Sequence, residues 1–551
     1  LRHLGAQRLA RVFAWRAWRA DRRSYAGCLV HGRELLWRRG HYFVWRWIHQ
    51  LAPLHGTADE EAEWLSFIAL QAAHLRDFTR SRETMERALE LSPGQAWLHV
   101  EQAYCLEQED RFAEALLACE RVLETWPDYR AARQQAASME MLLGRDAEAI
   151  ARLQTAAQDT QSAALLSQLG GWLIEHQRLD EAEQTLRRAE ACAILNDAAL
   201  KRWYAARYCD IACLRGDYEN GRHYAEQAGP GFYQGIAEKL RAPQGQRCLL
   251  PVSFVRQHHV TCGPATLTAI ARFWGRGVEH LQVAEEICYD GTPHFAERNW
   301  AERNGWLARE FTVDWDSCVA LIDRGIPFTL TTQTTGSGHL QAVIGYDAPR
   351  GTLLLRDPSQ RDYNELLADT FFAERKAFGP RGMLMLPLEE SARLEGVELP
   401  DAAQWDAYYA VIGALEVHHR EQAREGLARM VQHWPDDRLT AQAERALAGY
   451  DGSEAGRLAA TEKLLRMFPE DANLRLSKAA SLEQLATRAE QQEWYSQTAE
   501  HSADVWVLVR YAHFLAEDGS RQAQAQALLQ RALYAHPTLA TAWQGLASLL
   551  W

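Results

Sequence analysis

The sequence predicts an α+β domain inserted between two all-α superhelical arms. Prolines recur at a spacing of 34 residues both before and after the α+β segment, at Pro93 and Pro127 and again at Pro435 and Pro469. The helical pattern breaks at 242–246, and segments rich in β-forming residues follow it. A chain of 551 residues suits several compact domains or a solenoid, which grows without a single large core.

Four segments are expected in this fold class. They are a basic helical N-terminal segment at 1–58, helical repeats at 59–240, the α+β domain at 241–392, and further helical repeats at 393–551. The inserted segment has about 150 residues, which is enough to bury a core of its own. Helices followed by an antiparallel sheet define its layout.

The N-terminal segment is rich in arginine and tryptophan and holds only two acids before residue 50, Asp21 and Glu34. We interpret it as a capping segment whose arginine stems cover apolar surface. The alternative is a helix that binds a membrane surface or an anionic partner. Membrane contact is therefore expected only through this segment.

Composition narrows the class of protein. A net charge of −13 gives no general case for nucleic-acid binding, and no partner of that kind is expected. No run of 18 apolar residues and no secretory signal can be recognised, so no membrane span is expected. The ten cysteines are scattered without a C-x-x-C pair, as is typical of small buried side chains in a reducing compartment. We therefore expect a cytoplasmic protein.

The repeats contain two kinds of turn. Each recurring proline follows a helical run, and it marks a turn because proline cannot continue a helix. A second turn signal, Asp110-Arg111-Phe112-Ala113-Glu114-Ala115, recurs 34 residues later as Gly144-Arg145-Asp146-Ala147-Glu148-Ala149. The pattern resembles the tetratricopeptide repeat family over 60–230 and 400–551. That resemblance implies a superhelix whose concave groove binds peptides or proteins, although such repeats can also simply brace a domain.

Within the α+β domain, strands are expected where β-forming residues cluster between turn signals. The expected strands are 249–252, 326–332, 339–346, 352–356 and 382–387. A tight turn at 347–351 should join the third and fourth into a hairpin. Residues 276–316 are expected to wall a substrate groove. His294, Trp300, Trp306 and Trp315 lie there without a readable code, and core packing is the default expectation for the three tryptophans.

Cys262 is the strongest chemical signal. Apolar residues at helical spacing follow it, Pro264 suits a first helical turn, and Gly275 ends the pattern. The free N–H groups and positive dipole end of a helix N-terminus stabilise a thiolate. The alternative interpretation is a buried apolar cysteine.

Three further residues complete a candidate site. His339 opens an apolar strand, where it could take the thiol proton and later protonate a leaving amine. The predicted hairpin brings Asp357 back beside it, where a carboxylate can orient the imidazole. The amide of Gln257 could donate to a developing oxyanion. Taken singly, each residue also has an ordinary structural explanation.

Together these motifs, Gln257, Cys262-Gly263, Gly338-His339 and Asp357-Pro358, resemble the bacteriocin-processing peptidases. These papain-fold cysteine peptidases cleave bacterial leader peptides after a double glycine, and the resemblance covers about 245–390. It implies that Cys262 is the nucleophile, His339 the base, Asp357 the orienting residue and Gln257 the oxyanion donor. The family places the glutamine one residue further from the cysteine and often has an acid where Thr261 stands. No transmembrane or ATP-binding region follows, so leader cleavage is only one option.

The sequence thus predicts a cysteine peptidase or amide-bond hydrolase that forms a thioester at Cys262, with a peptide or protein substrate recruited by the repeats. A transferase that resolves the same thioester with an amine, and a non-catalytic binding platform, are the alternatives. No metal or cofactor is expected. His258 and His259 lack further ligands at zinc spacing, and no phosphate-binding loop G-x-x-x-x-G-K-[ST] is present.

Overall fold

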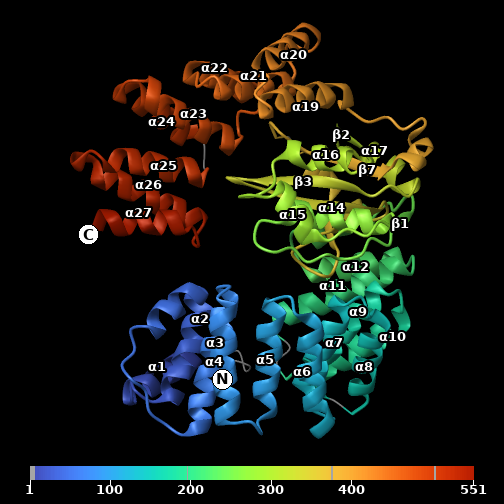
Figure 1. Ribbon diagram of the computed structural model, residues 1–551, viewed down its shortest axis with the longest axis vertical. Coiled ribbons are helices and arrows are strands. Elements are labelled where there is room, and N and C mark those ends of the chain that lie inside the picture. Colours follow the sequence, from blue (N-terminus) through green and yellow to red (C-terminus); the bar gives the residue numbers. More distant parts are fainter. Residues whose placement is uncertain (1–6, 160, 195–196, 374–375, 502–503, 551) are drawn as a thin grey trace. The chain divides into compact units, whose positions relative to one another are not determined.

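The computed structural model describes residues 7–159, 161–194, 197–373, 376–501 and 504–550. The chain forms two compact units, Leu1–Arg241 and Ala242–Trp551 (Figure 1). The first unit is helical, and the second contains the β-sheet followed by further helices. The predicted fold class, an α+β domain with helical repeats before and after it, is confirmed, while the four segment boundaries stay a prediction.

Helical hairpins make up most of the first unit. Its helices are α1 (Gln7–Ala20), α2 (Tyr25–Ile48), α3 (Ala58–His74), α4 (Phe78–Leu91), α5 (Ala96–Gln108), α6 (Phe112–Thr125), α7 (Arg130–Leu142), α8 (Asp146–Asp159), α9 (Ala163–Glu175), α10 (Leu179–Cys192), α11 (Ala198–Leu214), α12 (Tyr218–Ala228) and α13 (Phe232–Lys239). Consecutive helices from α3 to α12 pack in pairs, as the repeat pattern predicts.

The turn inside each hairpin explains the 34-residue register. The first helix of a pair ends at a residue in the left-handed backbone region, and successive examples are Arg76, Asp110 and Gly144. The same position recurs after the sheet at His418 and Gly452. A left-handed residue ends a helix because its N–H can bond back to the last turn. The predicted turns at 110 and 144 are therefore confirmed.

The described part of the basic N-terminal segment packs on the first repeat through aromatic side chains. The Trp18 ring stacks on His31 with centroids 4.5 Å apart, and Trp47 meets the edge of Trp64 on α3 at 6.1 Å. Residues 1–6 of this segment lie outside the described residues. The inner face of α2 therefore shares a core with α3, while Trp37 on its outer face is exposed.

A seven-stranded antiparallel sheet lies at the centre of the α+β domain (Figure 1). The strands are β1 (Arg247–Leu249), β2 (Trp306–Thr312), β3 (Phe328–Thr334), β4 (Ser337–Asp347), β5 (Thr352–Arg356), β6 (Asn364–Leu367) and β7 (Arg381–Pro387). They follow the order β2-β7-β3-β4-β5-β6, with β1 paired to β4. The predicted hairpin is present, because β4 and β5 pair with Asp347 opposite Thr352.

The sheet differs from expectation in three strands. β1 ends at Leu249, the first residue of the predicted strand 249–252, although the Leu250 N–H still donates to the Ile344 carbonyl at 2.7 Å. Pro251 has no N–H for a ladder, which explains the early end. β2 and β6 were not predicted. β2 alternates apolar residues with Arg309, and β6 has only four residues, so neither gives a strong β signal.

Helices cover the sheet on two sides and create two cores. Residues of α14 (Cys262–Phe273), α15 (His280–Ile287) and α16 (His294–Arg303) share one cluster with Ile344 and Met383. Leu321 and Ile322 of α17 (Trp315–Asp323) share the other with Phe328 and Leu353. The remaining short helices are α18 (Ala368–Ala373) and the 3-10 helix η2 (Leu388–Leu394). The sheet therefore holds the start of α14 at a fixed place beside β4.

The C-terminal helices form a second set of hairpins. They are α19 (Ala402–Glu416), α20 (Arg420–His433), α21 (Arg438–Tyr450), α22 (Glu454–Met467), α23 (Ala472–Leu485), α24 (Arg488–His501), α25 (Val505–Ala516), α26 (Gln522–Ala535) and α27 (Ala540–Leu550), with the 3-10 helix η3 (Gly519–Arg521) before α26. We call this set the C-terminal arm.

Buried polar contacts join the C-terminal arm to the sheet within the second unit. The indole N–H of the fully buried Trp405 donates to Thr312 at 3.1 Å, and Asp406 accepts hydrogen bonds from Arg298 and Arg309. The guanidinium of Arg438 donates to the Gly379 carbonyl at 2.9 Å. The first helices of the arm are thus fixed to the domain that carries Cys262.

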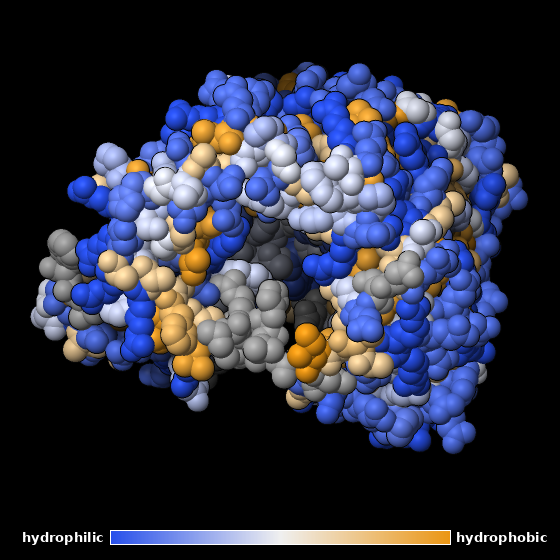
Figure 2. All heavy atoms as spheres, turned by 90° about the horizontal axis from the view of Figure 1, so that it is seen from below, coloured by the Kyte–Doolittle hydropathy of each residue, from blue (hydrophilic) through white to orange (hydrophobic). Residues whose placement is uncertain are grey.

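In the described ranges, no helix is both long and apolar enough to cross a membrane. On the face shown in Figure 2, hydrophilic side chains cover most of the surface, with smaller apolar patches between them.

Candidate active site

Cys262 is the first residue of α14, as predicted. The preceding Thr261 does not cap the helix with its side chain. Its hydroxyl accepts the His258 N–H at 2.8 Å and hydrogen-bonds with His280 at 3.2 Å. The first N–H groups of α14 thus have no side-chain cap, and the positive end of the helix dipole faces the sulfur.

Gly263 allows a loop to approach the start of α14. A Cβ at this position would lie 2.9 Å from the Thr292 hydroxyl oxygen and 3.0 Å from its Cβ. Such distances are shorter than ordinary van der Waals contact, so glycine is the residue that fits here. Because Thr292 lines the same cavity as Cys262, this close packing sets the cavity's width beside the sulfur.

His339 and Asp357 lie together at the end of the β4–β5 hairpin. The Nε2–H of His339 donates to Asp357 Oδ1 at 2.9 Å, which leaves Nδ1 for the thiol of Cys262. The carboxylate also accepts the Ser359 N–H at 2.8 Å and the amide of Asn364 at 3.2 Å. These additional donors fix the carboxylate, and through it the imidazole ring.

The three groups shift one another's ionisation. Burial raises the pKa of Cys262, but the His339 hydrogen bond, the Leu340 backbone N–H and the imidazolium charge bring its pKa below the usual thiol value. Hydrogen bonds to Asp357 and Cys262 raise the pKa of His339 to about 9. Burial raises the pKa of Asp357, yet bonds from His339 and Ser359 make it lower than normal. The directions of these shifts favour the thiolate–imidazolium form of the pair.

Gln257 lies at the same end of the cavity. Its backbone N–H donates to the Pro358 carbonyl at 2.9 Å, which ties its loop to the residue after Asp357. Its side-chain Oε1 is buried and has no hydrogen-bond partner among the described residues. The structure thus brings all four predicted site residues into one region, and their predicted roles remain to be tested.

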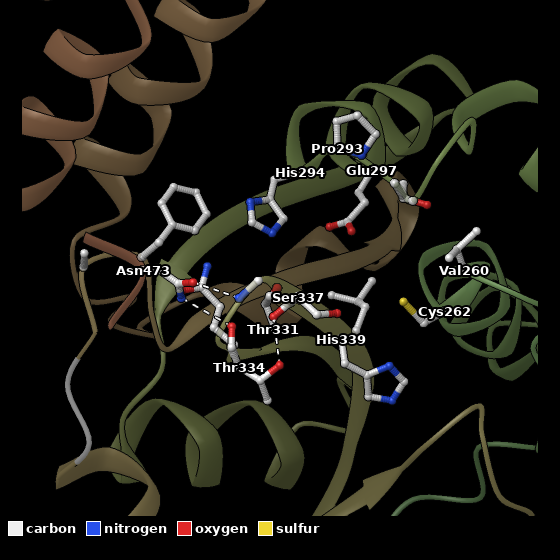
Figure 3. Close-up of a pocket in the computed structure, with 18 of the residues that line it drawn as sticks. Val260, Cys262, Pro293, His294, Glu297, Thr331, Thr334, Ser337, His339 and Asn473 are labelled. Carbon is white, nitrogen blue, oxygen red and sulfur yellow. Dashed lines mark hydrogen bonds between the residues drawn. The ribbon is translucent and has the colours of Figure 1, made fainter. Parts of the chain in front are cut away.

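A cavity of about 1140 Å³ extends from these residues to the C-terminal arm. Its near end contains Cys262 and His339, and its middle contains His294 and Glu297 of α16 (Figure 3). Gln257 also lines it. Its far wall comes from α19, α21 and α23. The volume exceeds that of a typical small-molecule pocket and suits several residues of a peptide.

A buried cluster of charged residues supports the middle of the cavity. Arg381, with no exposed surface, donates to Glu297 and Glu310 at 2.6 Å each, and it also bonds with Thr331. Burial raises the pKa of Glu297 to about 7, against the opposing effect of Arg381. Burial and the same cation hold the pKa of His294 well below its normal value. The guanidinium of Arg381 thus already donates its hydrogen bonds to groups of the protein itself.

Sequence reasoning missed several of these residues. Asn364 lies on the short strand β6. Its only sequence signal is that it is a polar residue seven positions after Asp357. Glu297 lies on α16, where no sequence motif indicated a functional residue. His294 had no assigned role in the sequence, and it lines the cavity and stacks on Phe378 at 4.7 Å. Trp300 and Trp306 are buried, as the default predicted.

The other candidate ligands do not form a metal site. His258 stacks on His280 with ring centroids 5.1 Å apart. Among the residues that the structure describes, no group of three His, Cys, Asp or Glu side chains is placed to hold a metal ion. In the described part of the chain, none of the ten cysteines forms a disulfide.

The fold and the Cys–His–Asp arrangement define the class as cysteine-peptidase-like. The model of the Peptidase_C39 like family matches residues 249–377, a stretch that includes all four predicted site residues. Among curated proteins, none matches this chain.

Solved structures resemble separate parts of the chain. The peptidase domain of Streptococcus ComA, a bi-functional ABC transporter of a quorum-sensing pathway, is 18% identical with a TM-score of 0.21, and the match covers 25% of this chain and 98% of that one. Pseudomonas aeruginosa PilF is 13% identical with a TM-score of 0.28, over 37% and 89%. PilW, a type IV pilus biogenesis factor, is 15% identical with a TM-score of 0.27, over 40% and 91%.

Proposed function

We propose that this chain is a cysteine peptidase or amide-bond hydrolase that acts through a thioester at Cys262. Its substrate is a peptide or protein recruited by the helical repeats. The observation that carries the proposal is the placement of Cys262 and His339 together at the end of a large cavity, with the His339 ring bonded to Asp357 at 2.9 Å. The direction of all three pKa shifts supports a reactive thiolate.

The reaction follows from the roles of these groups. The thiolate of Cys262 attacks the carbonyl carbon, and the imidazolium of His339 gives its proton to the leaving amine nitrogen as the C–N bond breaks. Neutral His339 then takes a proton from water, which attacks the thioester. The C–S bond then breaks and the acid product leaves, which restores the Cys262 thiolate beside a His339 imidazolium that keeps the proton taken from water. Asp357 holds the ring throughout and stabilises its charged form.

The oxyanion is assigned to the start of α14 and to Gln257. The backbone N–H of Cys262 lies in the first turn, where helical N–H groups have no intrahelical acceptor. The amide of Gln257 supplies a second donor, and its loop is held at Pro358. Removing one such donor in other hydrolases lowers kcat by about 10²–10³.

Partners and compartment complete the proposal. The C-terminal arm contributes the far wall of the cavity, which supports a peptide or protein substrate rather than a small molecule. Cysteines without disulfides among the described residues support a reducing compartment, and we place the protein in the cytoplasm.

A labelling experiment tests the proposal. Iodoacetamide should modify Cys262 much faster than Cys119 or Cys318, because burial raises the pKa of both of those thiols. Cleaved peptides should appear with the wild-type protein and disappear with Cys262→Ala. Product that forms only when an amine is added would instead indicate a transferase. Equal labelling of the three cysteines, together with full biological activity of Cys262→Ala, would establish a non-catalytic platform.

A further inference from the structure

One arginine in the cavity has no charged partner. Arg445 on α21 lines the far wall, and its guanidinium donates to the amide oxygen of Gln442 at 3.5 Å and to the hydroxyl of Ser477 at 3.2 Å. Both partners are neutral. In the described ranges of the chain, Arg445 forms no ion pair.

Other arginines of the C-terminal arm differ from Arg445. Arg420 is bonded to Asp451 at 2.6 Å, and Arg488 to Glu517 at 2.8 Å. These two side chains are about half exposed, so water could also solvate their charge. Arg445 is less exposed and lines the cavity, yet it lacks the carboxylate partner that Arg420 and Arg488 have. Stability does not explain the difference, because a partly buried cation without an anionic partner is less favourable than a paired one.

The carboxylates nearest to this part of the cavity already accept hydrogen bonds from other groups. Asp471 lines the same wall, but its carboxylate accepts the Leu474 N–H at 3.1 Å, where it caps α23, and the Ala377 N–H at 3.4 Å. Glu297, further along the cavity, is held by Arg381. Burial lowers the pKa of Arg445, and the charge of Arg457 adds to this effect, whereas Tyr408 and Asp471 oppose it. The protein therefore leaves the positive charge of Arg445 only partly balanced.

We propose that Arg445 binds a carboxylate of the substrate, either an Asp or Glu side chain or the C-terminal carboxylate. The planar guanidinium can hold a carboxylate through two parallel hydrogen bonds. Gln442 lies one helical turn before Arg445 on the same face of α21, and both line the cavity. This inference rests on the proposed function, because the same cavity contains Cys262, and it specifies an acidic peptide as the substrate class.

The test separates binding from cleavage. A degenerate library of eight-residue peptides, one half with free and one half with amidated C-termini, is presented to the Cys262→Ala protein, and the retained peptides are sequenced. Asp or Glu should be enriched at one position, or free C-termini should be enriched over amidated ones. Arg445→Glu in the same background should replace that preference with Lys or Arg, and Arg445→Lys should keep it. Single retained peptides should bind Arg445→Gln roughly tenfold more weakly or worse.

Matched controls make the result specific. Arg424 is an exposed arginine of α20 that pairs with Glu421 outside the cavity, so Arg424→Glu should leave the selected sequences unchanged. Circular dichroism verifies folding, and Arg445→Gln replaces Arg445→Glu if the latter unfolds. Retained peptides without acid enrichment, or with an enrichment that Arg445→Glu does not alter, would overturn the assignment even if wild type cleaves peptides. Acid enrichment that depends on Arg445, without cleavage by wild type, would support this inference and refute the proposed function.

Discussion

The contact between His339 and Asp357 allows a quantitative test of the proposed thiolate–imidazolium pair. In Asp357→Asn the side chain keeps its size but loses its charge, so the Nε2–H of His339 loses a charge-assisted acceptor at 2.9 Å. Such bonds contribute about 1.5–3 kcal/mol, and 1.36 kcal/mol corresponds to one pKa unit. The pKa of His339, raised to about 9 in wild type, should therefore fall by roughly 1–2 units.

The sign of the effect can be followed in a pH profile. The active form needs Cys262 deprotonated and His339 protonated, so activity is lost in acid as the thiolate gains a proton and lost in alkali as the imidazolium loses one. The alkaline limb should lie near 9 in wild type and move to lower pH in Asp357→Asn. The acidic limb, which reports the Cys262 thiol, should move less, because His339 is still protonated in acid and still stabilises the thiolate.

Thiolate absorbance at 240 nm, with Cys262→Ala subtracted, measures the acidic limb without a substrate. The rate of peptide cleavage measures the alkaline limb. Asp362→Asn is the matched control, since Asp362 lies in the same loop with a side chain 73% exposed and has only a long contact to Arg361 at 3.5 Å. An Asp357→Asn profile that overlays wild type would refute the assigned role of the carboxylate.

Three further predictions concern the frame of the site. Asn473→Ala removes the bonds to the β3–β4 hairpin that leads to His339, so hydrogen exchange in the hairpin should speed up and kcat/KM fall by roughly tenfold. Gly263→Ala brings a Cβ within 2.9 Å of Thr292, so urea unfolding should show a loss of about 1–3 kcal/mol. Arg381→Met leaves two buried carboxylates without their cation, and the free energy of unfolding should fall by about 3–5 kcal/mol.

Each of these predictions has a clear contrary result. Unchanged hydrogen exchange in Asn473→Ala would mean that the β3–β4 hairpin does not depend on these two bonds. The exchange rate of Asn473→Asp should be intermediate, because the carboxylate keeps the acceptor but loses the donor. Wild-type stability of Gly263→Ala would show that the Thr292 loop moves freely. For Arg381→Met, a stability equal to wild type at pH 7 would mean that the two buried carboxylates do not depend on this cation.

The sequence predicted the parts of the site that depend on local structure. Helical spacing and a first-turn proline placed Cys262 at the start of α14. The turn at 347–351 placed His339 and Asp357 on adjoining strand ends, because a hairpin returns the chain by a fixed register. Such features depend on residues within about one hairpin of each other, so a single sequence can carry them.

The far wall of the cavity could not be predicted, because its contacts join distant parts of the chain. The Gly336 N–H donates to the amide oxygen of Asn473 at 2.8 Å across a separation of 137 residues, and the Asn473 amide returns a bond to the Thr334 carbonyl at 3.3 Å (Figure 3). No periodicity or turn signal encodes such a pair.

These two bonds connect the proposed recruitment of substrate with the proposed chemistry. Asn473 lies in the first turn of α23 next to Leu474, and both line the cavity. The hairpin that Asn473 holds continues directly into His339. A peptide that fills the far wall must contact the same helix that fixes the hairpin. Substrates long enough to reach α23 should therefore gain in kcat as well as in KM, whereas truncated ones should lose both. In Asn473→Ala this dependence of kcat on peptide length should disappear, because the helix would no longer hold the strand that carries the base.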